Sequence, residues 1–160
     1  MRVRLKIINI FKYASFVAVI LYITFLLNAV SGSTRPFEEV AMPLEHVLAE
    51  SDLEQVDEQR FRRIFGYNAG DFEGAMMFVS TFHLSAEEVI LIKARDAEQT
   101  AEVSRIVEAR LSIRGQDFST YLPEQAKLIE QAQFTVRGNY IFLAIGPNAE
   151  ELRRIFTSAL

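Results

Sequence analysis

Hydrophobic and polar positions divide the chain into an apolar stretch near its start and a longer part in which the two kinds alternate. Residues 13–30 number eighteen and carry no charge. As a helix they would reach about 27 Å, against about 30 Å for the hydrocarbon core of a bilayer. We therefore expect a transmembrane signal anchor at 13–30, a short polar tether at 31–36 and a folded domain at 37–160.

Basic residues before that stretch predict its orientation. Residues 1–12 form a flank with four basic and no acidic side chains, namely Arg2, Arg4, Lys6 and Lys12. The positive-inside rule keeps such a flank in the cytoplasm and places the C-terminal domain outside, which predicts a single-pass protein of the cell membrane. The alternative is a signal peptide cleaved near Ser31, since Ala29 and Ser31 are small residues in the usual arrangement before Gly32. The product would then be a secreted soluble factor.

Periodic apolar positions from residue 37 onward predict several helices. The expected spans are 37–49, 57–66, 96–114, 123–132 and a last helix from 148 onward. Asp57 and Asp96 occupy N-cap positions, and Pro123 occupies the first helical position that proline favours. Gly115 is expected to end the third helix, which leaves 116–122 as a loop.

Strand patterns occur in two pairs between these helices. The expected strands are 75–82, 89–94, 134–137 and 140–145, with a two-residue hairpin turn at 138–139. Two hairpins separated by helices predict an α+β domain with an antiparallel four-stranded sheet packed with four to five helices. The second and fourth strands are apolar on both faces, so helices are expected to cover the sheet on both sides. An open face that binds something is the alternative.

Composition and charge argue against several classes of function. The chain has 17 basic and 21 acidic residues, and without the N-terminal flank the balance is 13 against 21, a net charge of −8. This balance argues against nucleic acid as a partner, because phosphate binding needs clustered Lys and Arg. Cysteine is absent, which excludes thiol catalysis, thiolate metal sites and a lipoprotein anchor. His46 and His83 lack metal-ligand spacing, so neither a metal nor another cofactor is expected.

Arg110 is the most informative charged residue, because it falls on the apolar side of its predicted helix. A buried guanidinium needs partners, which Tyr121, Glu124 or a carbonyl group of 116–122 is expected to supply. Arg110 and Tyr121 are therefore the candidate binding residues, and no catalytic residue is proposed, since no catalytic motif occurs. One interpretation is a clamp between helix and loop. The other is a pocket for a ligand carboxylate or phosphate.

Four short motifs carry a resemblance to a known family. They are Ser85-Ala86-Glu87-Glu88-Val89 before an apolar strand, Arg110-Leu111, Phe118 with Tyr121 and Pro123, and Gly138-Asn139-Tyr140 before a second apolar strand. With them, residues 45–160 resemble a family of uncharacterised extracytoplasmic domains of Gram-positive bacteria, known as a domain of unknown function, which usually follow a lipoprotein signal or a membrane anchor. The resemblance implies an extracytoplasmic, membrane-associated domain and no particular activity.

These observations together favour a module without enzymatic activity over an enzyme. We expect a protein-interaction or envelope accessory module at the outer face of the membrane, with another envelope or membrane protein as its partner. A cell-envelope hydrolase, whose carboxylates would converge only in the folded chain, is the alternative.

Overall fold

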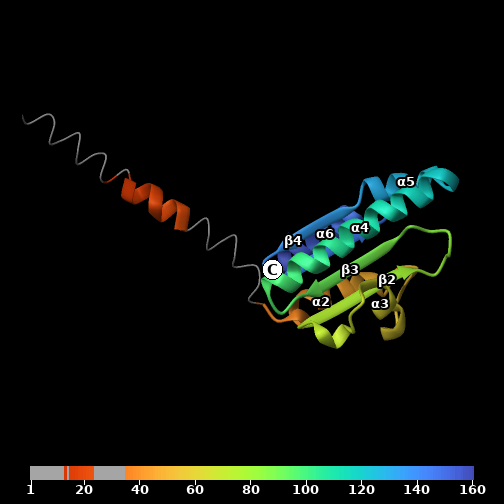
Figure 1. Cartoon of the computed structure of the whole chain (residues 1–160), viewed down its shortest axis with the longest axis horizontal. Helices are drawn as coiled ribbons and strands as arrows, with labels where there is room; N and C mark the ends of the chain where they lie inside the picture. The colour runs from red at the N-terminus through yellow and green to blue at the C-terminus, as the bar shows by residue number, and fades with distance from the viewer. Residues whose placement is uncertain (1–12, 14, 24–34) are drawn as a thin grey trace, which may run out of the picture.

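The computed structural model describes residues 13, 15–23 and 35–160. Residues 13 and 15–23 are helical (Figure 1). Across the described residues, no helix combines the length and the apolar character needed to cross a membrane. The expected flank at 1–12 lies outside the described residues, and so do residues 14 and 24–30 of the expected anchor and 31–34 of the expected tether.

From residue 35 onward the chain folds as an α+β domain (Figure 1). Its helices are α2 (Phe37–Leu48), α3 (Glu58–Phe65), the 3-10 helix η2 (Ala69–Asp71), α4 (Ala97–Tyr121), α5 (Pro123–Glu130) and α6 (Ala149–Ala159). Its strands are β1 (Leu53–Gln55), β2 (Gly74–Ser80), β3 (Glu88–Lys93), β4 (Gln133–Arg137) and β5 (Tyr140–Ile145). They form one antiparallel sheet in the order β1-β2-β3-β5-β4. The predicted class and both predicted hairpins, β2–β3 and β4–β5, are confirmed.

The prediction of four strands is wrong, because the sheet has a fifth, β1. This strand has three residues and pairs with the end of β2, where Leu53 lies opposite Ser80. Three residues are too few to show the alternation by which a strand is recognised in a sequence. The conformation of β1 is therefore set by its pairing with β2 rather than by a local pattern.

The predicted end of the third helix is also wrong, because α4 continues through Gly115 to Tyr121. A glycine ends a helix by taking a positive φ, as Gly66 does after α3 at 76°. Gly115 is not among the described glycines with positive φ, so the expected loop at 116–122 is helical as far as residue 121. Phe118 in the added turns packs against the core and stabilises this extension.

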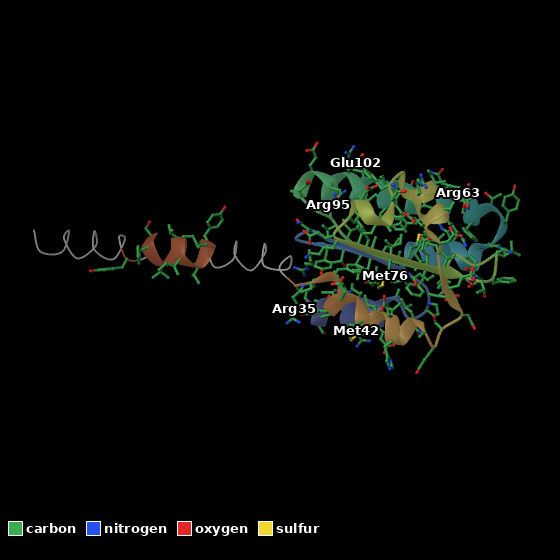
Figure 2. The ribbon with its side chains drawn as sticks, turned by 90° about the horizontal axis from the view of Figure 1, so that it is seen from below. Arg35, Met42, Arg63, Met76, Arg95 and Glu102 are labelled. Atoms are coloured by element: carbon green, nitrogen blue, oxygen red, sulfur yellow. The ribbon has the colours of Figure 1, made fainter. Side chains whose placement is uncertain are left out.

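Helices cover both faces of the sheet, as predicted. Figure 2 shows α4 and α3 on one side, with Glu102 and Arg63, and α2 on the other, with Met42. Every residue of β3 is buried. Ile90 and Ile92 join the core under α3, α4 and α5, whereas Val89 and Leu91 join the core against α2 and α6. Two separate cores therefore fix the centre of the sheet.

The sheet has two distinct ends, which we call the Glu87 end and the Tyr140 end. Glu88, the first residue of β3, lies at the Glu87 end, and Lys93, its last residue, lies opposite Tyr140. The Tyr140 hydroxyl donates a hydrogen bond of 2.9 Å to the Arg35 carbonyl. In Figure 1 the start of α2 and the C-terminus lie at the Tyr140 end, whereas the β2–β3 connection and α5 lie at the other. The chain thus joins the domain at the Tyr140 end.

Candidate functional site

A cleft of about 630 Å³ opens at the Glu87 end, next to the core of α2 and α6. We call it the Glu87 cleft. Its buried apolar lining is Leu48, Val89, Ile145, Ala149 and Leu152. Its polar lining is Glu50, Ser51, Asp52, Ser80, Thr81, Ser85, Glu87, Gln125 and Asn148. The volume lies within the range of ligand-binding cavities, roughly 300–1,000 Å³.

The charged side chains that line the cleft are all carboxylates. Glu87 is half-buried, whereas Glu50 and Asp52 are exposed. These three are not grouped closely enough to hold one metal ion, nor are any other acidic, His or Cys side chains in the described ranges. Phe82 also lines the cleft, although 65% of it is exposed. The cleft therefore offers negative charge and an aromatic ring to whatever enters it.

Local contacts fix Glu87 at the wall of the cleft. The Ser80 N–H donates to the Glu87 carbonyl at 3.1 Å, and the Glu87 N–H donates to the Ser85 hydroxyl at 3.1 Å. The same hydroxyl donates to the Glu87 carboxylate at 3.4 Å. Gly146 lies beside this carboxylate, since a Cβ there would be 3.4 Å from its Oε2 atom, an ordinary van der Waals contact. The connection between β2 and β3, residues 81–87, turns where the Ser85 N–H donates to the Phe82 carbonyl at 2.9 Å, and it presents Glu87 to the cleft.

Arg110 and Arg114 of α4 pair with the fully buried carboxylate of Glu88. Arg110 donates to both oxygens, from Nε at 2.8 Å and from Nη2 at 2.6 Å. Arg114 lies 3.8 Å from the same carboxylate. Burial lowers the pKa of the Arg114 guanidinium, and the Glu88 carboxylate opposes that shift. The bidentate pair of Arg110 with Glu88 compensates charges that would be costly if they were buried alone.

The residue before Glu87 is held from two helices. Arg114 donates to the Ala86 carbonyl at 3.2 Å, and the Gln125 side chain of α5 accepts the Ala86 N–H at 2.7 Å. Successive side chains of a strand point to opposite faces. The contacts of Ala86 and Glu88 with α4 and α5 therefore brace the start of β3 and fix the direction of Glu87 on the other face.

The two site residues proposed from the sequence have different surroundings. Arg110 binds Glu88 on β3, not the partners expected for it, because the expected loop is part of α4 and the guanidinium points to the sheet instead. Tyr121 ends α4 and is 82% exposed. Sequence reasoning missed Glu87 and its cleft. The motif around Ser85 was noted only as a run that precedes an apolar strand, and nothing in the sequence relates residue 87 to Gly146.

The fold and the cleft define an α+β domain with a polar cavity at one end of its sheet. The chain belongs to the family described as "Domain of unknown function (DUF4358)", whose model matches residues 47–146. The matched stretch runs from the last turn of α2 to Gly146, so it includes Glu87 and the Glu88–Arg110 pair. Neither a curated protein nor a solved structure gives a match. The part of the resemblance that concerns a domain of unknown function is thereby confirmed.

Proposed function

We propose that the protein is a non-enzymatic interaction module, tethered by residues 13–30 to the outer face of the cell membrane, whose domain binds another envelope or membrane protein. One observation carries the proposal: four basic residues precede an uncharged stretch of eighteen, the arrangement of a signal anchor. The likeness of residues 45–160 to extracytoplasmic domains of Gram-positive bacteria supports the same location.

The position of Arg35 indicates how the tethered domain would be oriented. A tether of residues 31–36 spans on the order of 15 Å, and Arg35 contacts Tyr140. The Tyr140 end would then face the bilayer, and the Glu87 cleft would open away from it. A cleft in that orientation is accessible to a partner in the envelope.

A topology experiment tests the location. Alkaline phosphatase, which is active only outside the cytoplasm, is fused after Leu160, and we expect high activity in whole cells. A matched fusion with Asn in place of the four basic residues of 1–12 should lose export or orientation. A wild-type reporter that remains in the cytosol contradicts the proposal. N-terminal sequencing of the same protein separates an anchor, which keeps residues 1–30, from a secreted factor that begins at Gly32.

A crosslinking experiment tests the interaction. A photoreactive amino acid replaces Phe82 at the Glu87 cleft or Met42 on the outer side of α2, both of which are exposed (Figure 2 shows Met42). An interaction module predicts one reproducible crosslinked partner in living cells from at least one of these positions. A domain that yields no such partner from either position contradicts the proposal.

A cell-envelope hydrolase is the second candidate, and one observation favours it. The cleft combines a half-buried carboxylate, Glu87, with the exposed Asp52, and acid–base pairs need unlike environments. The full chain is incubated with purified cell wall, and soluble fragments are measured over time. If the wild type releases soluble fragments and Glu87→Gln does not, the protein is a hydrolase and the proposal of a non-enzymatic module is rejected. The proposal expects that no fragments are released.

A further inference from the structure

We infer that the Glu87 cleft binds a basic segment of the partner protein, with a Lys or Arg side chain at the Glu87 carboxylate and its flanking residues along Phe82. The inference rests on the proposed function, because it names the surface through which the module meets its partner. It also states the chemistry of that partner.

Charge complementarity is the first argument for a cationic occupant. Glu50, Asp52 and Glu87 are the charged side chains among the residues that line the cleft. The hydroxyl groups around them, from Ser51 and Ser85, add hydrogen-bond acceptors for N–H donors. A cleft of this lining attracts a cation and repels an acidic segment.

An exposed aromatic side chain is the second argument. Phe82 and Leu84 are 65% and 56% exposed, and both lie in the connection between β2 and β3. Two large apolar side chains in water on one short connection suit a surface that becomes covered. An aromatic ring beside carboxylates favours an organic cation in particular, since the ring face attracts the charge.

The size of the cleft and the spread of its charges favour a segment of chain over a small ion. Glu50 and Asp52 come from the α2–β1 connection, Glu87 comes from the β2–β3 connection, and the three are not placed to share one metal ion. The buried apolar lining, with Leu48 and Leu152, offers a surface for the methylene stem of a long basic side chain. Charges that lie apart fit an occupant that carries more than one cation.

The bracing of β3 makes the site rigid before anything binds. Glu88 and Ala86 are held by Arg110, Arg114 and Gln125, and Glu87 lies between them. Little ordering of the Glu87 backbone is then required on binding, which favours affinity.

A peptide titration tests the inference on the full chain in micelles of a nonionic detergent. The probe is the fluorescent peptide acetyl-Gly-Lys-Leu-Lys-Gly-amide, and its matched control has Glu in place of both Lys. We expect the Lys peptide to raise its anisotropy on binding, more weakly as salt increases, and the Glu peptide not to bind. Glu87→Gln and Phe82→Ser should each weaken binding by about fivefold or more.

Matched substitutions outside the cleft control for general effects of charge and apolarity. Glu108→Gln and Ile113→Ser change an exposed carboxylate and an exposed apolar residue of α4, and both should leave binding unchanged. Thermal unfolding of Glu87→Gln checks that the variant is folded. Asp52→Asn, in an exposed connection, is a second cleft variant that should weaken binding without risk to the fold.

Several outcomes overturn the inference. One is that the Glu peptide binds as tightly as the Lys peptide. Another is that Glu108→Gln weakens binding as much as Glu87→Gln does. A third is that the Lys peptide does not bind at millimolar concentration. If acetyl-lysine amide binds as tightly as the peptide, the occupant is a small organic cation and a partner segment is rejected. Crosslinking distinguishes this failure from failure of the proposed function. A partner captured from Met42 but not from Phe82 would support the interaction module and reject the cleft as its binding surface.

Discussion

Strand β3 has a buried charge at each end, and the two are compensated in different ways. Glu88 is fully buried, and α4 supplies both hydrogen bonds to its carboxylate through Arg110. Lys93 is 8% exposed, and it pairs with Glu73, whose side chain is 41% exposed. Its ammonium also lies 5.6 Å from the centre of the Tyr140 ring. The first charge is held by a distant helix inside the protein, and the second by neighbours at the surface.

The two ends of the sheet also differ in packing: the Tyr140 end is filled with side chains, whereas the Glu87 end is open on one face. At the Tyr140 end, the Phe37 ring packs on Gly74 and the Tyr140 hydroxyl binds the Arg35 carbonyl. At the Glu87 end, the helices brace β3 from one side, and a cleft remains on the other. The filled end suits attachment of the chain, whereas the open end suits binding.

The largest effect on stability is expected from Arg110→Met. It leaves the buried Glu88 carboxylate with only Arg114 nearby, at 3.8 Å, so unfolding in urea should show a loss of about 3 kcal/mol. Arg105→Met on an exposed position of the same helix should change stability by less than about 0.5 kcal/mol. A variant that keeps wild-type stability but no longer crosslinks to its partner would support the ligand pocket instead of the clamp.

A double variant identifies the source of that loss. Arg110→Met combined with Glu88→Gln removes the uncompensated charge, so it should be more stable than Arg110→Met alone. Equal stability of the single and double variants would show that the buried charge is not the cause.

An intermediate effect is expected at the Tyr140 end from Gly74→Ala. A Cβ at Gly74 would overlap the Phe37 ring, and crowding of this kind costs about 1–3 kcal/mol. Gly70→Ala is the matched control, because nothing lies within 4 Å of a Cβ at that position. Equal thermal unfolding of the two variants would mean that the ring moves aside freely and that this end is less closely filled than described.

The smallest effect at neutral pH is expected from Tyr140→Phe. The substitution removes the hydrogen bond to Arg35 and should cost about 1 kcal/mol. Burial, assisted by the carboxylates of Glu73, Glu38 and Glu39, raises the pKa of Tyr140 to about 12. A tyrosine in an unfolded chain ionises near pH 10. The folded state therefore holds this proton more tightly, and its contribution is complete below pH 10 and decreases as pH rises towards 12.

Denaturation of the wild type and of Tyr140→Phe between about pH 10 and 12 tests the expected direction of the change in stability with pH. The stability advantage of the wild type over Tyr140→Phe should shrink as pH rises from about 10 towards 12. Tyr121→Phe, at an exposed tyrosine, should follow the wild-type curve throughout. A constant difference between wild type and Tyr140→Phe would exclude the buried hydroxyl as the cause.

Much of the fold was predictable because its signals are local. Asp57 and Asp96 both accept N-cap hydrogen bonds as expected, and the two fully buried strands were evident from their apolar runs. The predicted end of the helix at Gly115 was wrong, because a glycine permits a helix to end but does not require it. Packing of Phe118 against the core stabilises the helix beyond this residue. Strand β1 was missed because its conformation depends on β2.

The candidate site was much less predictable, because it depends on contacts between distant segments. Arg110 was recognised from its apolar surroundings, yet its partner Glu88 lies 22 positions earlier, on another element. The cleft combines segments that no spacing rule relates, from residue 47 to residue 152. Glu87 became a candidate only when the bracing of its neighbours and its position at the wall of the cleft, beside Gly146, were both known.

The order of the strands in the sheet has a consequence for how the protein folds. Strand β3 meets β2 through a short connection, but its other edge pairs with β5, which follows α4, α5 and β4 in the chain. The middle of the sheet cannot close until residue 145 is available, and such long-range pairing is slow. A growing chain that stops before β5 would expose the apolar edge of β3, and association with other chains is then expected in place of a stable half-domain.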